Sequence, residues 1–337
     1  MESVELYIGI DIAKSSFVAA RWDADKKRYF THQYAYLTDA DIQSFADTLT
    51  GRSVHLIMEA TGIYHLRLAY ALCDAGIPVS VVNPASVKHF AKMKNRITKT
   101  DRQDAVLLAR YGCSEKPSLF VVPSETLNKL SQRRMILRQI KEQKQALCNQ
   151  REAVSCNPKP DTFTSDYLNK TIARLEEDIN DIQVQIKELV DSDYKDHYEN
   201  LISIPGFGDA TATAFIEAAE SFAGLDGDNA VKAFSKFVGL APTCHQSGAT
   251  VRGQSHISRT AAPDLRRKLY MPAMSICTKK KAKESVFKTF YQRLREIGKS
   301  HKKAIIAVMH KMVRVAVAVI RSGVKFDPKV YGQLQTK

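Results

Sequence analysis

A heptad pattern between residues 168 and 189 constrains the fold of this chain more than any other feature. Apolar residues recur there at alternating intervals of four and three positions: Leu168, Ile172, Leu175, Ile179, Ile182, Ile186 and Leu189. This spacing puts an apolar stripe along one side of a helix and is typical of a coiled-coil seam. An earlier helical segment, at about residues 124–152, is expected to be its antiparallel partner or to extend it. The seam predicts helix pairing and leaves open whether the partner belongs to the same chain.

The first 120 residues have the pattern of an α/β domain. Strands are expected at residues 4–10, 17–22 and 28–34, then a helix at about 39–49, a strand at 54–58, a helix at about 64–75 and a strand at 78–82. Helical segments then run to about residue 112. The order βββαβαα predicts an RNase H-like fold.

The rest of the chain is predicted to be mainly helical, beyond a linker at residues 117–123. The stretch LISIPGFGDATATAFI, from residue 201, has the Pro-Gly-x-Gly turn of a helix-hairpin-helix element, which either binds phosphate at a helix N-terminus or simply packs two helices. The apolar run 304–320 contains His310, Lys311 and Arg314, so we expect a buried helix and no membrane span. The predicted domains are residues 1–120, 121–195 and 196–337.

The charge balance indicates a polyanionic partner. Lys and Arg number 50 against 36 Asp and Glu, for a net charge of +14. Nucleic acid fits this excess better than an acidic membrane surface, and a merely basic soluble protein is the plain alternative. The six cysteines form no CxxC pair, so the sequence predicts neither a zinc site nor a disulfide framework, and reduced thiols fit a cytoplasmic protein.

Four acidic residues fall at positions where they can converge. Asp11 and Glu59 follow the strands at 6–10 and 54–58, and the carboxyl ends of parallel strands face one crevice. Asp101 and Asp104 lie three positions apart on one side of a helix. Four such carboxylates would repel one another unless cations lay among them, so two Mg²⁺ ions are the expected cofactors. Taken singly, each acid is better explained as a solvated surface residue.

Basic residues close to these acids and elsewhere are expected to hold a nucleic-acid backbone. One set surrounds the second pair of acids, one lies on the helix at about 124–152, and one belongs to the run 279–303, where aromatic residues are interleaved. The predicted nucleic-acid contacts are Lys94, Lys99, Arg102, Arg133, Arg134, Arg138, Arg252, Lys279, Lys280 and Lys281.

Several blocks of the sequence resemble a known family. GIDIAK, MEATGIY and TKTDRQDA are similar to the three acidic blocks of the IS110-type transposases, the DEDD transposases related to Piv invertases. IPGFG, FVGLAPTCHQSGATVRGQSHIS and LRRKLYMPA resemble the family's second half, and the ordered blocks span about residues 7–323. The resemblance implies a RuvC-like first domain in which Asp11, Glu59, Asp101 and Asp104 are the DEDD acids that bind metal.

The resemblance also implies a catalytic serine, Ser247 in HQSGAT, although the residues alone would suggest only a loop turn at Ser247-Gly248. A serine that attacks a DNA phosphate conserves the bond energy in a phosphoserine link, so a 3′-OH can reseal the strand. Ser255 and Ser258 are rival nucleophiles that lack the Ser-Gly context. The loop after HIS departs from the family pattern, so His245, His256 and Arg259 receive no role.

The resemblance further implies partners. These are donor and target DNA, a structured non-coding (bridge) RNA encoded by the element, and further copies of the chain, as a dimer that assembles into a tetramer with active sites shared between subunits. The expected function is therefore that of a transposase, a DNA recombinase in the prokaryotic cytoplasm, associated with the nucleoid. The alternatives are a RuvC-like metal-dependent nuclease that hydrolyses branched DNA, with Ser247 structural, and a non-catalytic nucleic-acid-binding scaffold.

Overall fold

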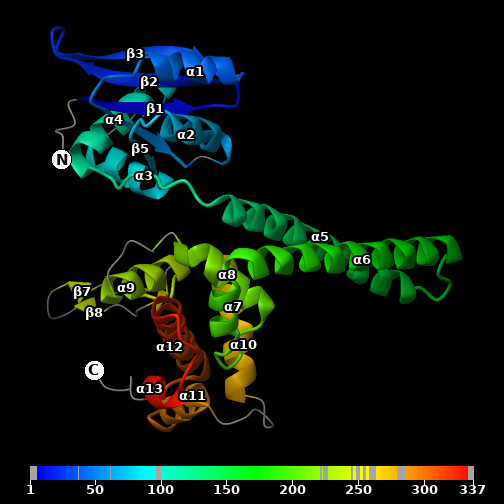
Figure 1. Cartoon of the computed structure of the whole chain (residues 1–337). Helices are drawn as coiled ribbons and strands as arrows, with labels where there is room; N and C mark the ends of the chain where they lie inside the picture. The colour runs from blue at the N-terminus through cyan, green and yellow to red at the C-terminus, as the bar shows by residue number, and fades with distance from the viewer. Residues whose placement is uncertain are drawn as a thin grey trace. The chain divides into compact units, whose positions relative to one another are not determined.

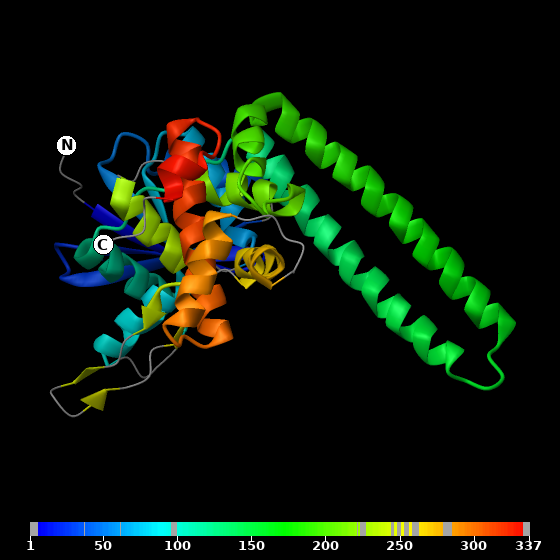
Figure 2. The same ribbon diagram turned by 90° about the horizontal axis from the view of Figure 1, so that it is seen from below.

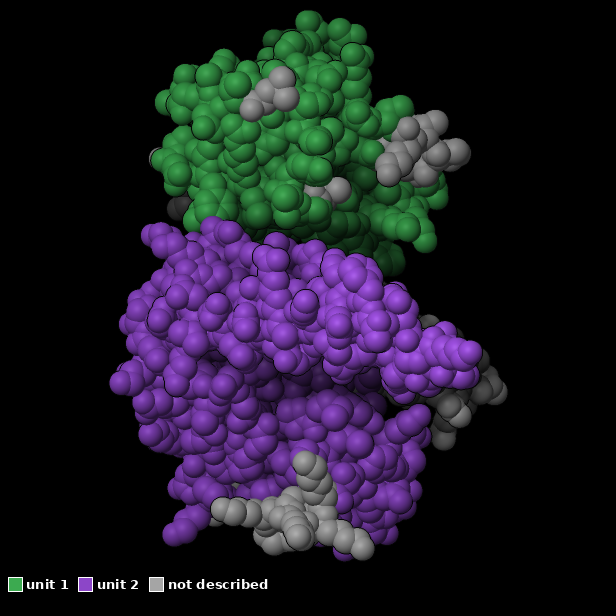
Figure 3. Space-filling model, turned by 90° about the vertical axis from the view of Figure 1, so that its right-hand side faces the viewer, with its two compact units in different colours: residues 1–122 green, residues 123–337 purple. Residues whose placement is uncertain are grey.

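The structure is a computed structural model of the 337-residue chain. It describes residues 6–36, 38–60, 62–95, 100–220, 222, 227–243, 246–247, 251–252, 256–257, 263–278 and 285–332. The chain forms two compact units, Met1–Val122 and Pro123–Lys337, which are coloured separately in Figure 3.

The first unit is built on a mixed five-stranded sheet with the order β3-β2-β1-β4-β5 (Figure 1). β1 (Leu6–Ile12), β2 (Ser16–Asp23) and β3 (Arg28–Ala35) form an antiparallel meander. β4 (Val54–Glu59) and β5 (Val79–Val82) extend the sheet in parallel with β1. The predicted strands are confirmed, and the arrangement is consistent with an RNase H-like fold.

Helices cover both faces of this sheet. Side chains alternate along a strand, so Ile10 and Met58 pack in one core with α1 (Asp39–Asp47) and α2 (Tyr64–Asp74). Ile57 packs on the opposite face with α3 (Pro84–Met93) and α4 (Asp101–Glu115). The functional consequence is that odd-numbered positions of β1 and β4, including Asp11 and Glu59, belong to the α3–α4 face.

The second unit begins with a hairpin of two long helices, α5 (Glu125–Ser155) and α6 (Thr162–Asp193), which lie side by side in Figure 2. Three contacts join the two helices: Arg133 to Gln185, Lys144 to Glu176 and Arg151 to Asn169. Residue numbers rise along α5 from one contact to the next and fall along α6, so the helices are antiparallel. All seven residues of the predicted seam are buried or half-buried. The partner of this stripe is therefore α5 of the same chain, while supercoiling along the seam stays a prediction.

Shorter helices form the rest of this unit. They are α7 (Lys195–Ile202), α8 (Asp209–Glu220), α9 (Gly227–Val238), α10 (Pro263–Thr278), α11 (Val286–Glu296), α12 (His301–Ser322) and α13 (Pro328–Gly332). α12 buries most of its length, including Val308, Met312 and Val319, as the sequence predicts. None of the helices in the described parts of the chain is long and apolar enough to cross a membrane.

Two short features of this unit bear on the predicted motifs. The Pro-Gly turn joins α7 to α8, and Gly206 has a left-handed φ of 87° there. Because an added Cβ would also lie 2.3 Å from Cδ1 of Ile276, glycine suits this turn for two reasons. Two-residue strands follow α9: β6 (Pro242–Thr243) pairs with β9 (His256–Ile257), and β7 (Gln246–Ser247) pairs with β8 (Val251–Arg252). A phosphate-binding role for the turn stays a prediction.

Candidate functional site

Asp11 and Glu59 occupy neighbouring positions at the ends of two parallel strands. The register pairs Ile10 of β1 with Met58 of β4, so the next positions along, Asp11 and Glu59, face each other across the pair. Both Ile10 and Met58 are fully buried in the α1–α2 core, whereas both acids are half-buried and belong to the opposite face. The sheet thus presents two carboxylates side by side, as the strand-end positions predict.

A glycine brings α4 onto this same face. A Cβ added at Gly9 would lie 2.0 Å from the carbonyl oxygen of Ala105 and 2.3 Å from the amide nitrogen of Ala109, so only glycine permits this approach. Further along the helix, Gly112 lies against Tyr7 and Ile57. As β1 advances from Tyr7 to Gly9, its contacts on α4 therefore move back towards the N-terminus of the helix. The next residue on that face, Asp11, consequently lies towards the first turn of α4.

That first turn carries the other two acids. Thr100 caps the helix by accepting a hydrogen bond from the amide of Gln103 at 3.3 Å, and Asp101 and Asp104 follow directly. Asp101 is exposed and Asp104 is half-buried. Acids in a first turn stabilise a helix through its dipole in any case, so their position alone does not require catalysis. Their placement opposite the strand ends is what distinguishes them.

The fit of these residues to a divalent metal is good in chemistry and incomplete in geometry. Carboxylate oxygens are the hard ligands that Mg²⁺ prefers, and all four acids come from one end of the first unit. Among the described residues, however, no three His, Cys, Asp or Glu side chains converge closely enough to hold a metal ion. The backbone thus brings the four acids to one region, while their side chains do not close around a common point.

Ser247 lies in the second unit, in the strand pair that follows α9. It is the second residue of β7 and pairs with Val251, while Gln246 pairs with Arg252. The described backbone of β7 and β8 therefore forms a short antiparallel pair. The surroundings of the Ser247 and Arg252 side chains lie outside what the structure describes, as do Gly248 and the rivals Ser255 and Ser258. The catalytic role of Ser247 stays a prediction.

The basic residues predicted near the acids differ in what they contact. Lys94 is the C-cap residue of α3, and its Nζ lies 5.4 Å from the centre of the Phe90 ring. Arg102 is exposed on the first turn of α4, beside Asp101. Lys99, Lys279, Lys280 and Lys281 lie outside the described residues. Arg102 thus has the exposure that a backbone contact needs.

The predicted contacts on α5 separate into packing and surface residues. The Nη1 of Arg133 donates a 2.8 Å hydrogen bond to the carbonyl oxygen of Gln185 and ties α5 to α6. Arg134 was expected to contact nucleic acid, but its side chain is only 13% exposed and pairs with Glu217 and with Asp264, the latter at 3.6 Å. Arg138 is exposed. Arg134 is therefore committed to joining α5, α8 and α10.

The partners of Arg134 form a small charged network. Lys268 donates to Asp264 at 2.6 Å. Burial alone would raise the pKa of Asp264, but the hydrogen bond and charge of Lys268, with the charges of Arg134 and Arg138, lower it. Burial and the nearby Arg134 lower the pKa of Lys268. Sequence inspection missed this network, and only the spacing of Asp264 and Lys268, four apart on a helix, gave a signal.

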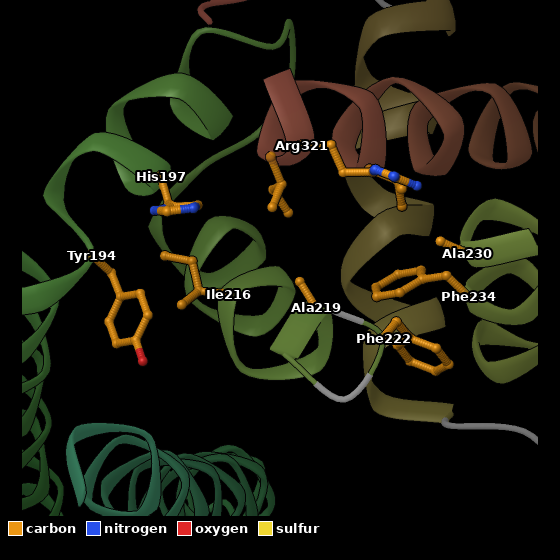
Figure 4. Close-up of a pocket in the computed structure, with 10 residues that line it drawn as sticks. Tyr194, His197, Ile216, Ala219, Phe222, Ala230, Phe234 and Arg321 are labelled. Carbon is orange, nitrogen blue, oxygen red and sulfur yellow. The ribbon is translucent and has the colours of Figure 1, made fainter. Parts of the chain in front are cut away.

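Two cavities of 460 Å³ lie in the second unit. One is lined by apolar residues of α8, α9 and α12, among them Phe234, and by Phe222 between α8 and α9, with His197 and Arg321 beside it (Figure 4). No predicted site residue lines it. The other cavity is basic and includes Arg138 together with Lys187 and Arg267, which the sequence did not single out.

Comparison with known proteins gives consistent matches along the chain. Residues 8–154 match the model of the IS110 DEDD transposases, and residues 198–292 match that of the "Transposase IS116/IS110/IS902 family". The chain is 32% identical to the "Pilin gene-inverting protein" of Moraxella bovis, over 96% of this chain and 98% of that protein. It is 27% identical to the "Insertion element IS110 uncharacterized 43.6 kDa protein" of Streptomyces coelicolor, over 39% of this chain and 30% of that protein.

Proposed function

Because this chain belongs to the IS110 family of DEDD transposases, and so to enzymes that rearrange DNA, we propose that it cuts and rejoins strands through a phosphoserine intermediate. The observation that carries the proposal is the close approach of α4 to β1 at Gly9, which brings the first turn of α4 towards Asp11 and Glu59. We further propose residues 1–120 as the DEDD domain, 121–195 as coiled-coil helices and 196–337 as the domain with the catalytic serine.

The four acids would bind divalent metal at the end of the sheet. Held by Asp11, Glu59, Asp101 and Asp104, Mg²⁺ would neutralise charge on the scissile phosphate and on the leaving oxygen. Arg102, exposed beside the acids, would hold a neighbouring phosphate of the same strand. The half-buried positions of Asp11, Glu59 and Asp104 limit how far these carboxylates can move, which suits a set that positions a substrate.

Ser247 would supply the covalent step. Its Oγ attacks the phosphorus and loses its proton, the bond from phosphorus to the O3′ atom breaks, and O3′ gains a proton as a free 3′-OH. A 3′-OH from another strand then attacks the phosphoserine, which restores a phosphodiester bond and the serine hydroxyl. The exchange needs no external energy source because one phosphoester is traded for another.

The partners follow from the same reading. Donor and target DNA are the substrates, and we propose that an element-encoded bridge RNA selects them by base pairing. The excess of basic residues, with a net charge of +14, suits a protein that holds both nucleic acids. We also propose that dimers assemble into a tetramer in which Ser247 of one subunit completes the acidic site of another.

Trapping of the covalent intermediate tests the proposal. Purified protein is mixed with the element-end RNA, labelled donor and target DNA and Mg²⁺, then denatured and separated on a gel. We expect a labelled protein band that is absent in Ser247→Ala and in Asp101→Asn, with Ser255→Ala and Ser258→Ala as matched controls that keep it. Cleaved DNA without attached protein, unchanged in Ser247→Ala, would instead identify a nuclease that hydrolyses branched DNA.

A further inference from the structure

A basic groove lies at the root of the α5–α6 hairpin. This 460 Å³ cavity is bordered by α5 and α6 on one side and by α7, α8 and α10 on the other. Figure 2 shows the hairpin extending away from the other helices of the second unit, so the groove lies where the hairpin joins them. Five elements of one compact unit thus fix its walls.

The floor of the groove is a set of charges that neutralise one another. Arg134 pairs with Glu217 and Asp264, and Asp264 also accepts from Lys268. The hydroxyl of Tyr198 donates a 2.7 Å hydrogen bond to the Oδ1 of Asp209. These contacts engage the acids Asp264 and Asp209 with groups of the protein itself and hold α5, α8 and α10 together.

The rim of the groove carries positive charges that are not paired with any acid the structure describes. Arg138 and Lys141 come from α5, Lys187 from α6 and Arg267 from α10, and all four are exposed. Within the described parts of the chain, none of the four has an ion pair with an acid. Glu142 is the remaining acid in the lining. The groove therefore has a net positive rim built from three helices.

The charged network indicates that this positive potential is felt inside the groove. Burial raises the pKa of Asp264, whereas Lys268, Arg134 and Arg138 lower it; burial, followed by the charge of Arg134, lowers the pKa of Lys268. Crowded cations with few acids favour binding of an anion. The exposed Val184 and the half-buried Leu137 add apolar surface between the charges, which suits sugar or base edges.

A polyanion fits this arrangement better than a single small anion. The four cations stand on three helices around the groove, and two of them, Arg138 and Lys141, are about 4.5 Å apart along the axis of α5. Duplex nucleic acid carries one charge per roughly 1.7 Å of its axis, so several cations can each find a phosphate at once. A spread of this kind matches the repeat of a nucleic-acid backbone.

We propose that this groove binds the phosphate backbone of a nucleic acid through Arg138, Lys141, Lys187 and Arg267. The floor pairs hold the three helices in place and so fix the spacing of the rim cations. The inference rests on the proposed function, which supplies RNA and DNA as partners, and it adds a specific site that α5 alone would not provide. Arg134 belongs to the scaffold of this site, and Lys187 and Arg267 are new members of it.

Equilibrium binding of labelled probes tests the groove. The rim variant changes Arg138, Lys141, Lys187 and Arg267 to Gln in the full chain, and a control variant changes the exposed Lys170, Arg174, Lys195 and Lys236 to Gln, for the same loss of charge. The probes are a fluorescent RNA hairpin and a DNA duplex of equal length, titrated over a range of salt concentrations. Thermal unfolding confirms that both variants fold, and the single charge reversal Lys187→Glu is a second, milder probe.

We expect the rim variant to bind at least one probe about tenfold to a hundredfold more weakly, with a slope of log affinity against log salt less steep by about three to four, as four lost phosphate contacts predict. The control variant should lose less than about threefold in affinity, because its charges act only at a distance. Loss for the RNA alone, for the DNA alone or for both identifies what the groove holds. Equal losses in the rim and control variants would overturn the proposal.

The chemistry proposed above can be separated from this result. If the rim variant binds more weakly than the control variant and no covalent band forms with the unaltered protein, the recombination mechanism fails while the groove stands. If the covalent band forms and the rim variant binds like the control, the groove fails alone.

Discussion

Arg134 joins three helices through one guanidinium group. Its side chain is 13% exposed, and its acidic partners Glu217 and Asp264 are about one-third exposed. Removing the cation takes the ion-pair partner from the partly buried Glu217 and leaves Asp264 paired with Lys268 alone, which is the costly way to break an ion pair. We expect Arg134→Met to lower the free energy of unfolding by about 1–3 kcal/mol, since partial exposure reduces the full buried-pair cost.

Chemical denaturation would measure this change, with Arg138→Met as the control. Arg138 lies one turn further along the same helix, is exposed and has no ion pair in the described parts of the chain, so its replacement should change stability by less than about 0.5 kcal/mol. Equal effects of the two substitutions would contradict a scaffold role for Arg134.

Gly9 is the residue on which the proposed acidic site depends most. Any side chain there must push α4 away, because a Cβ would lie 2.0 Å from the Ala105 carbonyl oxygen. Gly9→Ala should lower stability by about 1–3 kcal/mol and, by shifting the first turn of α4, reduce strand transfer by at least about tenfold. Gly208→Ala is the matched control for stability alone, since an added Cβ meets nothing within 4 Å there. Full strand transfer by a correctly folded Gly9→Ala protein would refute the positioning argument.

Lys311 is a buried lysine in α12 whose Nζ has no hydrogen-bond partner among the described residues and lies 5.0 Å from the centre of the Phe290 ring. Burial lowers its pKa, and Arg293 and Arg314 lower it further, from the ordinary 10.5. At pH values between the lowered pKa and 10.5, the unfolded chain binds more protons at this lysine than the folded chain does, so stability rises with pH there. Below the lowered pKa the folded protein carries the whole cost of the buried charge, and this cost disappears as pH rises to 10.5.

Lys311→Met should therefore raise the free energy of unfolding at neutral pH, by about 1–2 kcal/mol after the loss of the cation–π contact. The gain should shrink as pH approaches 10.5. Denaturation curves measured from neutral to alkaline pH would show the trend, and the exposed Lys325→Met would serve as a control. A gain that stays constant with pH would indicate improved packing alone.

At the scale of the element, the α5–α6 hairpin depends on its apolar seam. Ile179 is 7% exposed in that seam, whereas Ile136 on α5 is 46% exposed. Ile179→Ala should weaken the hairpin by about 2–3 kcal/mol through lost burial and a cavity, and Ile136→Ala should have little effect. Hydrogen exchange of the α5 and α6 amides would report the local change. Similar protection in both variants would contradict pairing through this seam.

Periodicity explains why the elements could be predicted from the sequence. Alternation marked the strand before Asp11, a short apolar run marked the strand before Glu59, and the 3–4 spacing from Leu168 to Leu189 marked α6, because burial leaves a local pattern. The role of Arg134 leaves no such pattern: Glu217 is 83 residues away in sequence. The fit of Gly9 against Ala105 likewise depends on a contact between distant segments. Helices, strands and the acids at strand ends can therefore be predicted from local residue spacing. Which charged side chains are buried in ion pairs and which stay exposed depends on contacts between distant segments, which local spacing does not show.

At the scale of the whole molecule, the two units have separate cores. Among the described residues, the cores of the first unit contain only residues from Leu6 to Phe120, and the large core of the second begins at Leu127. A fragment of residues 1–122 should therefore fold cooperatively by itself and lack strand transfer, because Ser247 is absent from it. Circular dichroism and thermal unfolding of the fragment would test this. A fragment that unfolds without a cooperative transition would show that the first unit needs the second.

The hairpin also has a mechanical consequence. α6 has 32 residues and is about 48 Å long at 1.5 Å per residue. A rigid rod of that length is a lever, so a turn of about 5° at its base displaces its tip by about 4 Å. The groove lies at the base of the hairpin, where such a turn would occur. Arg138 and Lys187 belong to the hairpin helices α5 and α6, and Arg267 belongs to α10, against which the hairpin packs. A nucleic-acid strand bound in the groove would set the angle of the α5–α6 hairpin relative to α10. Binding at the base of the hairpin would therefore displace its tip.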